Sequence, residues 1–313
     1  MARDPSEMDL AARAAWLSFV GGMTQDQIAA DLGISRQRAQ RLVARASAEG
    51  LVRVRIAHRI DACLRLEAEL KRRYGLEAAW VSPSAGAGVE PLVGLAPFAA
   101  PLIERLFEPA ERQTVAVGTG RTLRMVVENL RHLDAAQHRL VAMNGNVAPD
   151  GSATAFEVIV RMAEKTSAPH FQLAIPVVAR TEAEYALYLS LPHVKASRAL
   201  AESADVAIVG IGQMADDAPL FVDGFITAAE LAELQAAGAA GEIAGHIFDD
   251  EGVYLAHPVN DRIMGLRVPV PDMRVICIGC GPTKIRALHG ALRGRLFTTL
   301  VTDETTAAAL LAE

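Results

Sequence analysis

The spacing of hydrophobic positions changes along the chain and separates a short N-terminal part from a longer remainder. Between residues 9 and 48 apolar side chains recur every three or four positions, with glycines at the breaks, which is the pattern of short amphipathic helices. Beyond Leu76, short apolar runs end in glycine or polar residues and alternate with helical patterns. The pattern therefore predicts a helical head followed by an α/β body.

The head is predicted to contain three helices. The first begins after Asp9, its expected N-cap, and ends at a pair of glycines. Thr24 is expected to cap the second helix, and Gln27 three positions later completes a capping box. Ser35 is expected to cap the third helix, which extends to about Ala48. The succession of helix, glycine, isoleucine, serine and helix is typical of a helix-turn-helix motif.

The third helix has one apolar face and one face rich in arginine and glutamine. In the major groove, arginine pairs with guanine and glutamine with adenine, so the second face predicts a DNA-reading helix. The alternative is an ordinary three-helix bundle with a solvated charged face, but the specific turn before this helix favours DNA binding. The residues expected to contact DNA are Thr24, Gln25, Ser35, Arg36, Gln37, Arg38, Gln40, Arg41 and Arg45.

Charge separates the same two parts of the chain. Residues 1–60 contain nine arginines and six acidic residues and so carry +3, whereas the whole chain carries −6 and the remainder therefore −9. The alternating stretch 51–56 predicts a short strand after the third helix, with Arg53 and Arg55 pointing outward as phosphate contacts. A basic head on an acidic body predicts that the head alone meets a polyanion.

Composition excludes several classes of protein. No apolar stretch of the 313 residues approaches the roughly 20 needed to span a bilayer, and the N-terminus lacks the apolar core of a secretory signal. Three cysteines are too few for a disulfide framework. Cys277 and Cys280 form a C-x-x-C pattern, which suits a redox pair or half a zinc site, but no second pair completes four ligands. We expect a cytoplasmic protein with no membrane partner, metal or cofactor.

A further helix is predicted between head and body, over residues 60–75. Its apolar positions lie at near-helical intervals opposite a polar face. It either packs on the body or helps to pair subunits, and we favour pairing because specific DNA sites usually require two heads. The expected divisions are a DNA-binding domain over 1–59, a connecting helix over 60–76 and an effector domain over 77–313, in a homo-oligomer that is a dimer or a tetramer.

The body predicts a mainly parallel, doubly wound sheet, because apolar strands alternate with helices. In such sheets ligands bind beyond the carboxyl ends of the strands, where the glycines and polar residues of this chain fall. The expected strands lie in the segments QTVAVGTGRTL, HRLVAMNGNVA, FQLAIPVVA, ADVAIVGIGQM, MRVICIGCGPTK and FTTLVTDETTA.

The loop 118–122, Gly-Thr-Gly-Arg-Thr, is a candidate anion site. Its glycines let backbone N–H groups approach phosphate oxygens, and the following helix adds its dipole. The loop has neither the Walker nor the dinucleotide-binding spacing. Lys284 follows another strand end and either faces solvent or meets a phosphate. Asp249 and Asp303 lie at predicted turns, where they either bind sugar hydroxyls or serve as turn and helix-capping residues.

Taken together, these segments resemble the SorC family of bacterial transcriptional regulators over nearly the full chain. The matching elements, in order, are MTQDQIAADLGISRQRAQRLV, VGTGRT, ADVAIVGIG, AAGAAGEIAGHIFDDEG, GCGPTKIRALHGALRG and LVTDETTAAALL. The resemblance implies a winged-type helix-turn-helix head and a body similar to sugar-phosphate isomerases. It further implies that the body binds a sugar, polyol or sugar phosphate, that the head binds double-stranded operator DNA, and that tetramers form.

Carried onto this chain, the resemblance implies a set of effector-binding residues at the strand ends. One departure stands out: Asn144 and Asn146 flank Gly145 where the family pattern leads us to expect a glycine pair, which favours a different effector. The implied set is Gly118, Thr119, Gly120, Arg121, Thr122, Asn144, Gly145, Asn146, Gly210, Gly212, Phe248, Asp249, Lys284 and Asp303.

The sequence leads us to a transcriptional regulator of a carbohydrate or polyol operon, and two other hypotheses remain beside it. An isomerase or deaminase of sugar phosphates needs a base over the reacting carbon, for which Asp249, Asp303 or His246 are available without forming a dense cluster. An architectural DNA-binding protein would use the body only to oligomerise.

Overall fold

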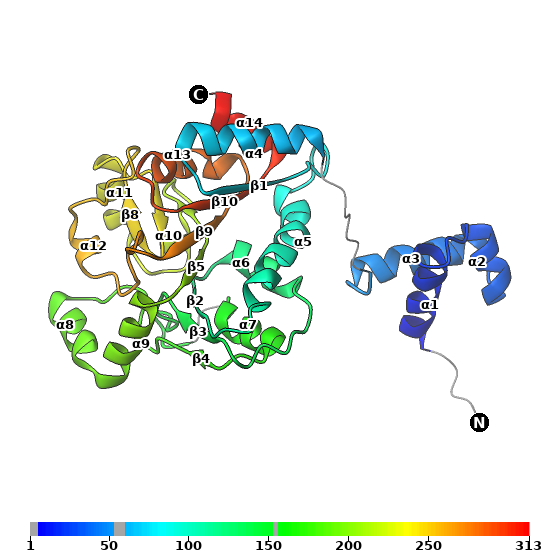
Figure 1. Cartoon of the computed structure of the whole chain (residues 1–313), viewed down its shortest axis with the longest axis horizontal. Coiled ribbons are helices and arrows are strands. Elements are labelled where there is room, and N and C mark those ends of the chain that lie inside the picture. The colour runs from blue at the N-terminus through cyan, green and yellow to red at the C-terminus, as the bar shows by residue number, and fades with distance from the viewer. Residues whose placement is uncertain (1–5, 53–59, 153–155, 313) are drawn as a thin grey trace. The chain divides into compact units, whose positions relative to one another are not determined.

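The computed structural model of the protein describes residues 6–52, 60–152 and 156–312. The chain divides into two compact units, a head up to residue 57 and a body from residue 58 onward, and both appear in Figure 1. Each unit has its own hydrophobic core.

The head consists of the helices α1 (Glu7–Phe19), α2 (Gln25–Leu32) and α3 (Arg36–Ala48). Small side chains dominate its core, which allows the helices to approach closely. Outside the core, the reading face predicted for α3 remains exposed. The buried members of this core are Ala11, Ala14, Ala15, Ile28, Ala29, Ala39, Leu42 and Ala46.

The expected caps of the second and third helices are confirmed, whereas that of the first is wrong. The Thr24 side chain accepts from the Gln27 N–H in a capping box, and Ser35 accepts from the Arg38 N–H. Ser6, not Asp9, is the N-cap of α1, and Asp9 is the third helical residue, which completes a capping box with Ser6. Most of the strand predicted over 51–56, including both of its arginines, lies outside the described residues.

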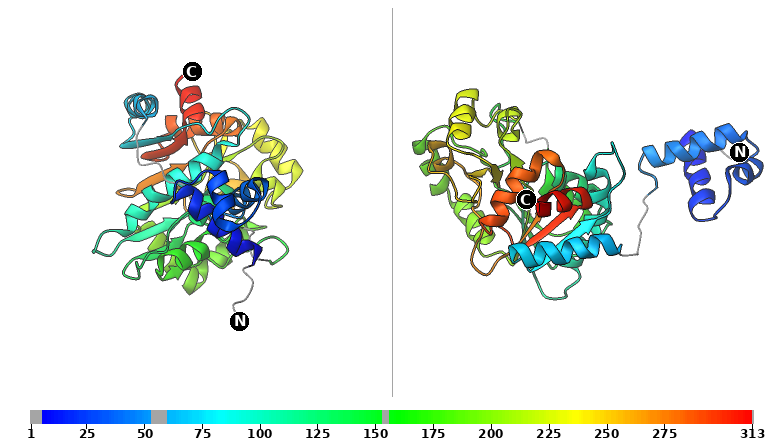
Figure 2. Two further views of the ribbon diagram at one scale, coloured as in Figure 1. Left: turned by 90° about the vertical axis from the view of Figure 1, so that its right-hand side faces the viewer. Right: turned by 90° about the horizontal axis from the view of Figure 1, so that it is seen from above.

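The body is built on a seven-stranded sheet in which every neighbouring pair is parallel. The expected parallel α/β architecture is confirmed, and Figure 2 shows the sheet between its two layers of helices. In spatial order the strands are β1 (Ala78–Ser82), β10 (Thr299–Asp303), β9 (Arg274–Ile278), β5 (Val206–Val209), β2 (Thr114–Val117), β3 (Arg139–Ala142) and β4 (His170–Phe171).

Alternate residues of each strand enter opposite hydrophobic cores, as the period of two in a strand requires. On β2, Val115 and Val117 join one core, while Ala116 joins the other. The first core is shared by α5 (Pro91–Glu104), α6 (Arg121–Glu128) and α7 (Val158–Thr166). The second is shared by α4 (Asp61–Tyr74), α13 (Ile285–Arg293) and α14 (Glu304–Ala312).

The remaining elements of the body lie outside the seven-stranded sheet. Three short antiparallel strands, which the sequence did not reveal, form a second sheet that supports a third hydrophobic cluster. These strands are β6 (Gly212–Gln213), β7 (Gly241–Ile243) and β8 (His246–Phe248). The remaining helices are η1 (Arg105–Phe107), α8 (Glu182–Ser190), α9 (Pro192–Glu202), α10 (Pro219–Val222), α11 (Ala228–Ala236), α12 (Pro258–Asp261) and η2 (Pro282–Lys284).

The strand expected in FQLAIPVVA is much shorter than predicted. Only His170 and Phe171 form β4, which pairs with β3 at the edge of the sheet. Pro176, later in the segment, has no N–H to donate to a sheet ladder, and proline is rare inside strands for this reason. Beyond β4 the segment makes only isolated bridges, from Pro176 to Val147 and from Val178 to Ile263.

The helix expected between head and body is α4, and it packs against the body. Cys63, Glu67 and Leu70 are buried, and Glu67 Oε1 accepts a hydrogen bond from the Val81 N–H at 3.1 Å. At its end, the Tyr74 hydroxyl donates to the Leu310 carbonyl at 2.7 Å, and α4 lies beside α14 (Figure 2). Within the described residues, no helix has both the length and the apolar character needed to cross a membrane.

Candidate functional site

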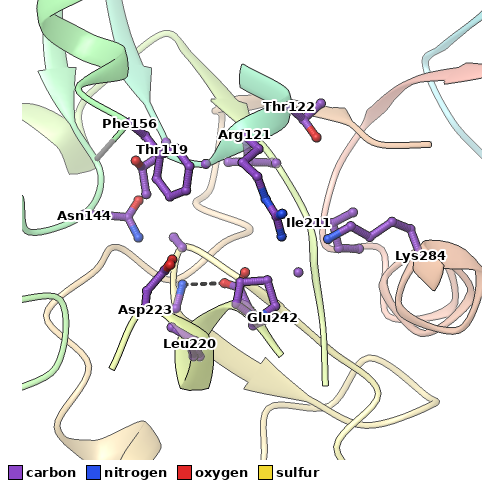
Figure 3. A pocket seen from close by; sticks show the side chains of 18 of the residues that line it. Thr119, Arg121, Thr122, Asn144, Phe156, Ile211, Leu220, Asp223, Glu242 and Lys284 are labelled. Atoms are coloured by element: carbon purple, nitrogen blue, oxygen red, sulfur yellow. Dashed lines mark hydrogen bonds between the residues drawn. The ribbon is translucent and has the colours of Figure 1, made fainter. Parts of the chain in front are cut away.

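A cavity of about 610 Å³ lies at the carboxyl ends of the central strands of the body. Parallel α/β sheets place their ligand sites there, because the loops that leave neighbouring strands diverge and open a crevice. Figure 3 shows polar side chains from several of these loops pointing into the cavity. The expected residues that line it are Gly118, Thr119, Gly120, Arg121, Thr122, Asn144, Gly210, Gly212 and Lys284.

The loop 118–122 connects β2 to α6 and forms one wall of the cavity. Gly118 lies against β5, where its N–H donates to the Ile208 carbonyl at 2.9 Å. Gly120 has a φ of +116°, which a residue with a side chain rarely adopts, and no side chain caps the helix that follows it. The loop therefore presents the N-terminal end of α6 to the cavity, an arrangement that favours anions.

Two cationic side chains point into the cavity. Arg121 begins α6, and Lys284 ends η2 just after Gly281 (Figure 3). Burial lowers the pKa of Lys284 below its usual range, and the nearby Glu242 carboxylate counteracts part of that effect. A desolvated ammonium group interacts more strongly with a bound anion than an exposed one does.

Two carboxylates, which sequence reasoning missed, line the same cavity near these cations. Glu242 is the central residue of β7, and its Oε2 accepts from the Gly245 N–H at 2.8 Å. Asp223 follows α10, and both groups appear in Figure 3. Burial raises the pKa of Glu242 and that of Asp223, while Arg121 lowers that of Asp223. One feature of the sequence could have revealed Glu242: it is a single charged residue within the otherwise apolar stretch around β7.

Gly212 leaves the space that the Glu242 carboxylate occupies. A Cβ atom added at Gly212 would lie only 2.0 Å from Glu242 Oε1. Any other residue at this position therefore has to displace the carboxylate from its place at the cavity wall. The close approach gives the second glycine of the Gly-Ile-Gly sequence after β5 a role in shaping the cavity.

The segment after β3 lies at the opposite end of the cavity from Lys284. Asn144 lines the cavity and is 6% exposed, and its Oδ1 has no hydrogen-bond partner among the described residues. Gly145 and Asn146 lie beyond the main cavity and line a smaller one beside it. A Cβ atom at Gly145 would be 2.2 Å from the Pro176 carbonyl oxygen, so only glycine fits between these segments.

Three of the expected effector-binding residues do not line either cavity. Phe248 is fully buried and packs edge-on against Tyr254. Asp249 stabilises a turn, because its Oδ1 accepts from the Glu251 and Val253 N–H groups. Asp303 is buried and accepts from the Thr305 N–H and from the Thr306 hydroxyl.

Asp303 nevertheless supports the cavity from behind. The Thr306 hydroxyl that it binds accepts a hydrogen bond from the Gly281 N–H at 2.8 Å, and Gly281 lines the cavity just before Lys284. The carboxylate thus fixes the start of α14 and, through Thr306, the loop that carries Lys284. The hydrogen bonds of Asp303 agree with a helix-capping role, one of the two alternatives that the sequence left open.

The C-x-x-C pair consists of two free thiols. Cys277 is buried in β9, while Cys280 lines the cavity, and burial raises the pKa of Cys280 to about 12. His246 is also buried; its Nε2 lies 2.9 Å from the Gly265 carbonyl, and burial lowers its pKa to about 4. No group of three or more potential metal ligands occurs among the described residues.

The predicted reading face of α3 is accessible over its whole length. Arg36, Gln37, Arg38, Gln40 and Arg41 are all exposed, and so is Arg45. Two of the arginines form surface ion pairs, between Arg36 and Asp26 at 3.4 Å and between Arg45 and Glu7 at 2.9 Å. Thr24 and Ser35 use their hydroxyls as caps, and Gln25 is half-buried.

Comparisons with known proteins agree with this division of the chain. A family model described as "Putative sugar-binding domain" matches residues 58–312, and a model of the MarR family matches residues 14–59. The erythritol catabolism regulatory protein EryD of Brucella abortus (strain 2308) is 35% identical over 306 residues, which cover 97% of this chain and 96% of that protein. Transcriptional regulator LsrR of Escherichia coli (strain K12) is 30% identical over 313 residues, with 97% and 95% covered.

A solved structure resembles the whole chain as well. The full-length sorbitol operon regulator SorC from Klebsiella pneumoniae has a TM-score of 0.72 and 27% sequence identity, and the match covers 98% of this chain and 100% of that one. The similarity includes both head and body, so the combination of the two units recurs and not only the fold of each.

Proposed function

Because the chain belongs to the SorC family of bacterial transcriptional regulators, we propose that its cavity binds the effector that controls the affinity of the head for operator DNA. The protein is a regulator with a helix-turn-helix head and a sugar-binding body, not an enzyme. The proposed effector site consists of the loop 118–122, Asn144, Glu242 and Lys284.

The chemistry of the cavity favours a polyol that carries a phosphate. Arg121, Lys284 and the amides at the start of α6 suit an anion. Glu242 and Asp223 suit hydroxyl groups, because a carboxylate accepts hydrogen bonds from them. The gathering of two cations and two carboxylates around one cavity is the observation that carries the proposal. The names of EryD and SorC refer to erythritol and to a sorbitol operon, which supports a polyol operon here too.

We further propose that α3 reads the operator and that the protein acts as a homo-oligomer, a dimer or a tetramer, in the cytoplasm. Single heads of this size contact few base pairs, and paired heads reach two half-sites. The DNA-binding domain would comprise residues 1–59, the connecting helix 60–76 and the effector domain 77–313. In this arrangement an effector regulates transcription if it binds the DNA-competent and incompetent states with different affinities.

The effector assignment is tested by a thermal-shift screen of sugars, polyols and their phosphates, followed by titration calorimetry of the compounds that stabilise the protein. We expect Lys284→Ala and Arg121→Ala to weaken a phosphorylated polyol far more than the matching free polyol. Arg124→Ala is the matched control, since Arg124 lies on the same helix and pairs with Glu128 at 2.9 Å. Equal losses for the two compounds would contradict a phosphate site at these residues.

A further inference from the structure

A second, smaller cavity adjoins the effector cavity in the body. It has a volume of about 130 Å³ and shares the lining residues Gly118, Thr119 and Asn144 with the larger one. We call it the side chamber, and its remaining lining residues are Val117, Ala142, Gly145, Asn146, Glu157, Val158, Ile159, Val160 and Gln172. Figure 3 shows Thr119 and Asn144 at the end of the effector cavity away from Lys284.

The polar groups of the side chamber differ from those of the main cavity. Three amide side chains line it, from Asn144, Asn146 and Gln172, and its lining includes no lysine, arginine or histidine. The charged residue of the lining is Glu157, which is an acid. An anionic group in this chamber would therefore meet no side-chain cation.

The first turn of α7 lines the side chamber and brings backbone N–H donors to it. The N-cap of this nine-residue helix is Glu157, which has a φ of +42° and makes no side-chain capping bond. The N–H groups of Val158, Ile159 and Val160 have no acceptor among the described residues. The first N–H groups of a helix need an external partner, which a cap normally supplies.

Unused acceptors lie beside these donors. The Oδ1 atoms of Asn144 and Asn146 are buried and have no partner in the described part of the chain. Asn146 Nδ2 donates to Gln172 Oε1 at 2.8 Å, which orients that amide but leaves its oxygen unpaired. Buried polar atoms without partners are uncommon in native proteins, so this group of asparagines points to a ligand.

We propose that the side chamber binds an uncharged, hydroxyl-bearing end of the effector, whose other end lies at Arg121 and Lys284. A hydroxyl donates one hydrogen bond and accepts others, so it serves the asparagine oxygens and the α7 amides together. A carboxylate or phosphate only accepts, so it could bind the α7 amides but would leave the asparagine oxygens unpaired. The proposal rests on the proposed function and deepens it: the effector is a polyol with one charged end, not a diacid or bisphosphate.

The size of the chamber agrees with this assignment. A volume of 130 Å³ corresponds to roughly four water molecules at the volume that water occupies in the liquid. Such a space accommodates the one or two hydroxyl-bearing carbons at the end of an open chain. A sugar ring would not fit in the side chamber.

The test compares probe pairs that differ only in this end group. Sorbitol 6-phosphate ends in a hydroxymethyl group and 6-phosphogluconate in a carboxylate; erythritol 4-phosphate and erythronate 4-phosphate are the four-carbon pair. Calorimetry on the full-length protein identifies which of the two alcohols binds more tightly. That alcohol should bind at least about tenfold more tightly than the acid of its pair, because buried polar groups left unpaired reduce affinity.

The variants Asn144→Ser and Asn146→Gly should each reduce this preference. Because the two positions are separate, one variant can be measured even if the other does not fold. Asn129→Ala is the control that should keep the preference, since Asn129 Nδ2 donates to the Met125 carbonyl within α6. If the wild-type protein binds no alcohol or acid of either pair, the proposed function fails. If it binds the acid as tightly as the alcohol, or if both variants keep the preference, the side-chamber proposal fails while the effector site at Lys284 stands.

Discussion

The head and the body place their functional side chains in opposite environments. On the head, Arg36, Gln37, Gln40 and Arg41 lie on the outside of a small alanine-rich bundle. In the body, Lys284 and its neighbours line a cavity, where burial lowers the pKa of that lysine. The head meets a large, highly charged polymer at its surface, whereas the body surrounds a small molecule.

The difference shows how each unit obtains its binding energy. Arginines on an exposed helix lose little solvation until DNA arrives, and their contacts with phosphates weaken as salt rises. Lys284 in the cavity is already desolvated, so its interaction with an effector is stronger and less dependent on salt. Raising the salt concentration should therefore weaken operator binding more than effector binding. Substitutions should likewise change one of the two affinities without changing the other.

The largest effect is expected on the head. Replacing both Arg36 and Gln40 with alanine should lower operator affinity by at least about 30-fold, because each bidentate contact with a base contributes about 1–3 kcal/mol. Effector binding should not change. Electrophoretic mobility shift or anisotropy titrations of the operator, beside calorimetry of the effector, measure the two events.

Arg13→Ala supplies the control for this substitution. Arg13 is exposed on α1 and lies outside the predicted reading face, so its removal changes the net charge of the head without removing a base contact. Undiminished operator affinity in the double variant, or an equal loss in Arg13→Ala, would show that α3 is not the reading helix.

A smaller effect is expected in the body, as a dependence of effector binding on pH. In the proposed effector site the protonated ammonium of Lys284 would bind the phosphate, and its pKa lies below the ordinary lysine value of 10.5 because the group is buried. As the pH rises through this lowered pKa, the charge is lost and affinity for a phosphorylated polyol should fall by about tenfold, the order of a charge-assisted hydrogen bond.

Lys284→Arg tests the source of that pH dependence. A guanidinium group stays protonated throughout this range, so a variant that still binds should keep a constant affinity between neutral pH and pH 10. Calorimetry of the same phosphorylated probe across this range compares the two proteins. An identical alkaline loss in both would exclude Lys284 as the titrating group.

The contrast between the units also explains which features the sequence reveals. The reading face lies within one helix, and its capping signals at Thr24 and Ser35 are local, so the head could be predicted almost in full. The first N-cap was misassigned because Ser6 and Asp9 both suit that position, and only the reciprocal hydrogen bonds decide between them.

The body was predictable as a fold and only partly as a site. Its longer strands end in glycine-rich loops that mark the cavity, which made loop 118–122 and Lys284 visible. The strands β6 to β8 contain only two or three residues each, too few for a periodic pattern, so Glu242 was missed along with its strand. Asp223 was missed because no motif surrounds it, and tertiary folding alone brings it opposite Arg121.

The most direct test of effector control measures how operator binding and effector binding affect each other. Operator affinity of the full-length protein should be measured without and with a saturating phosphorylated polyol, and the affinity of that polyol without and with saturating operator. Because the couplings are thermodynamically linked, both affinities should change by one common factor, about 5- to 150-fold if the coupling is of ordinary size. A polyol phosphate that occupies the cavity but leaves operator affinity unchanged would contradict control of the head by the effector.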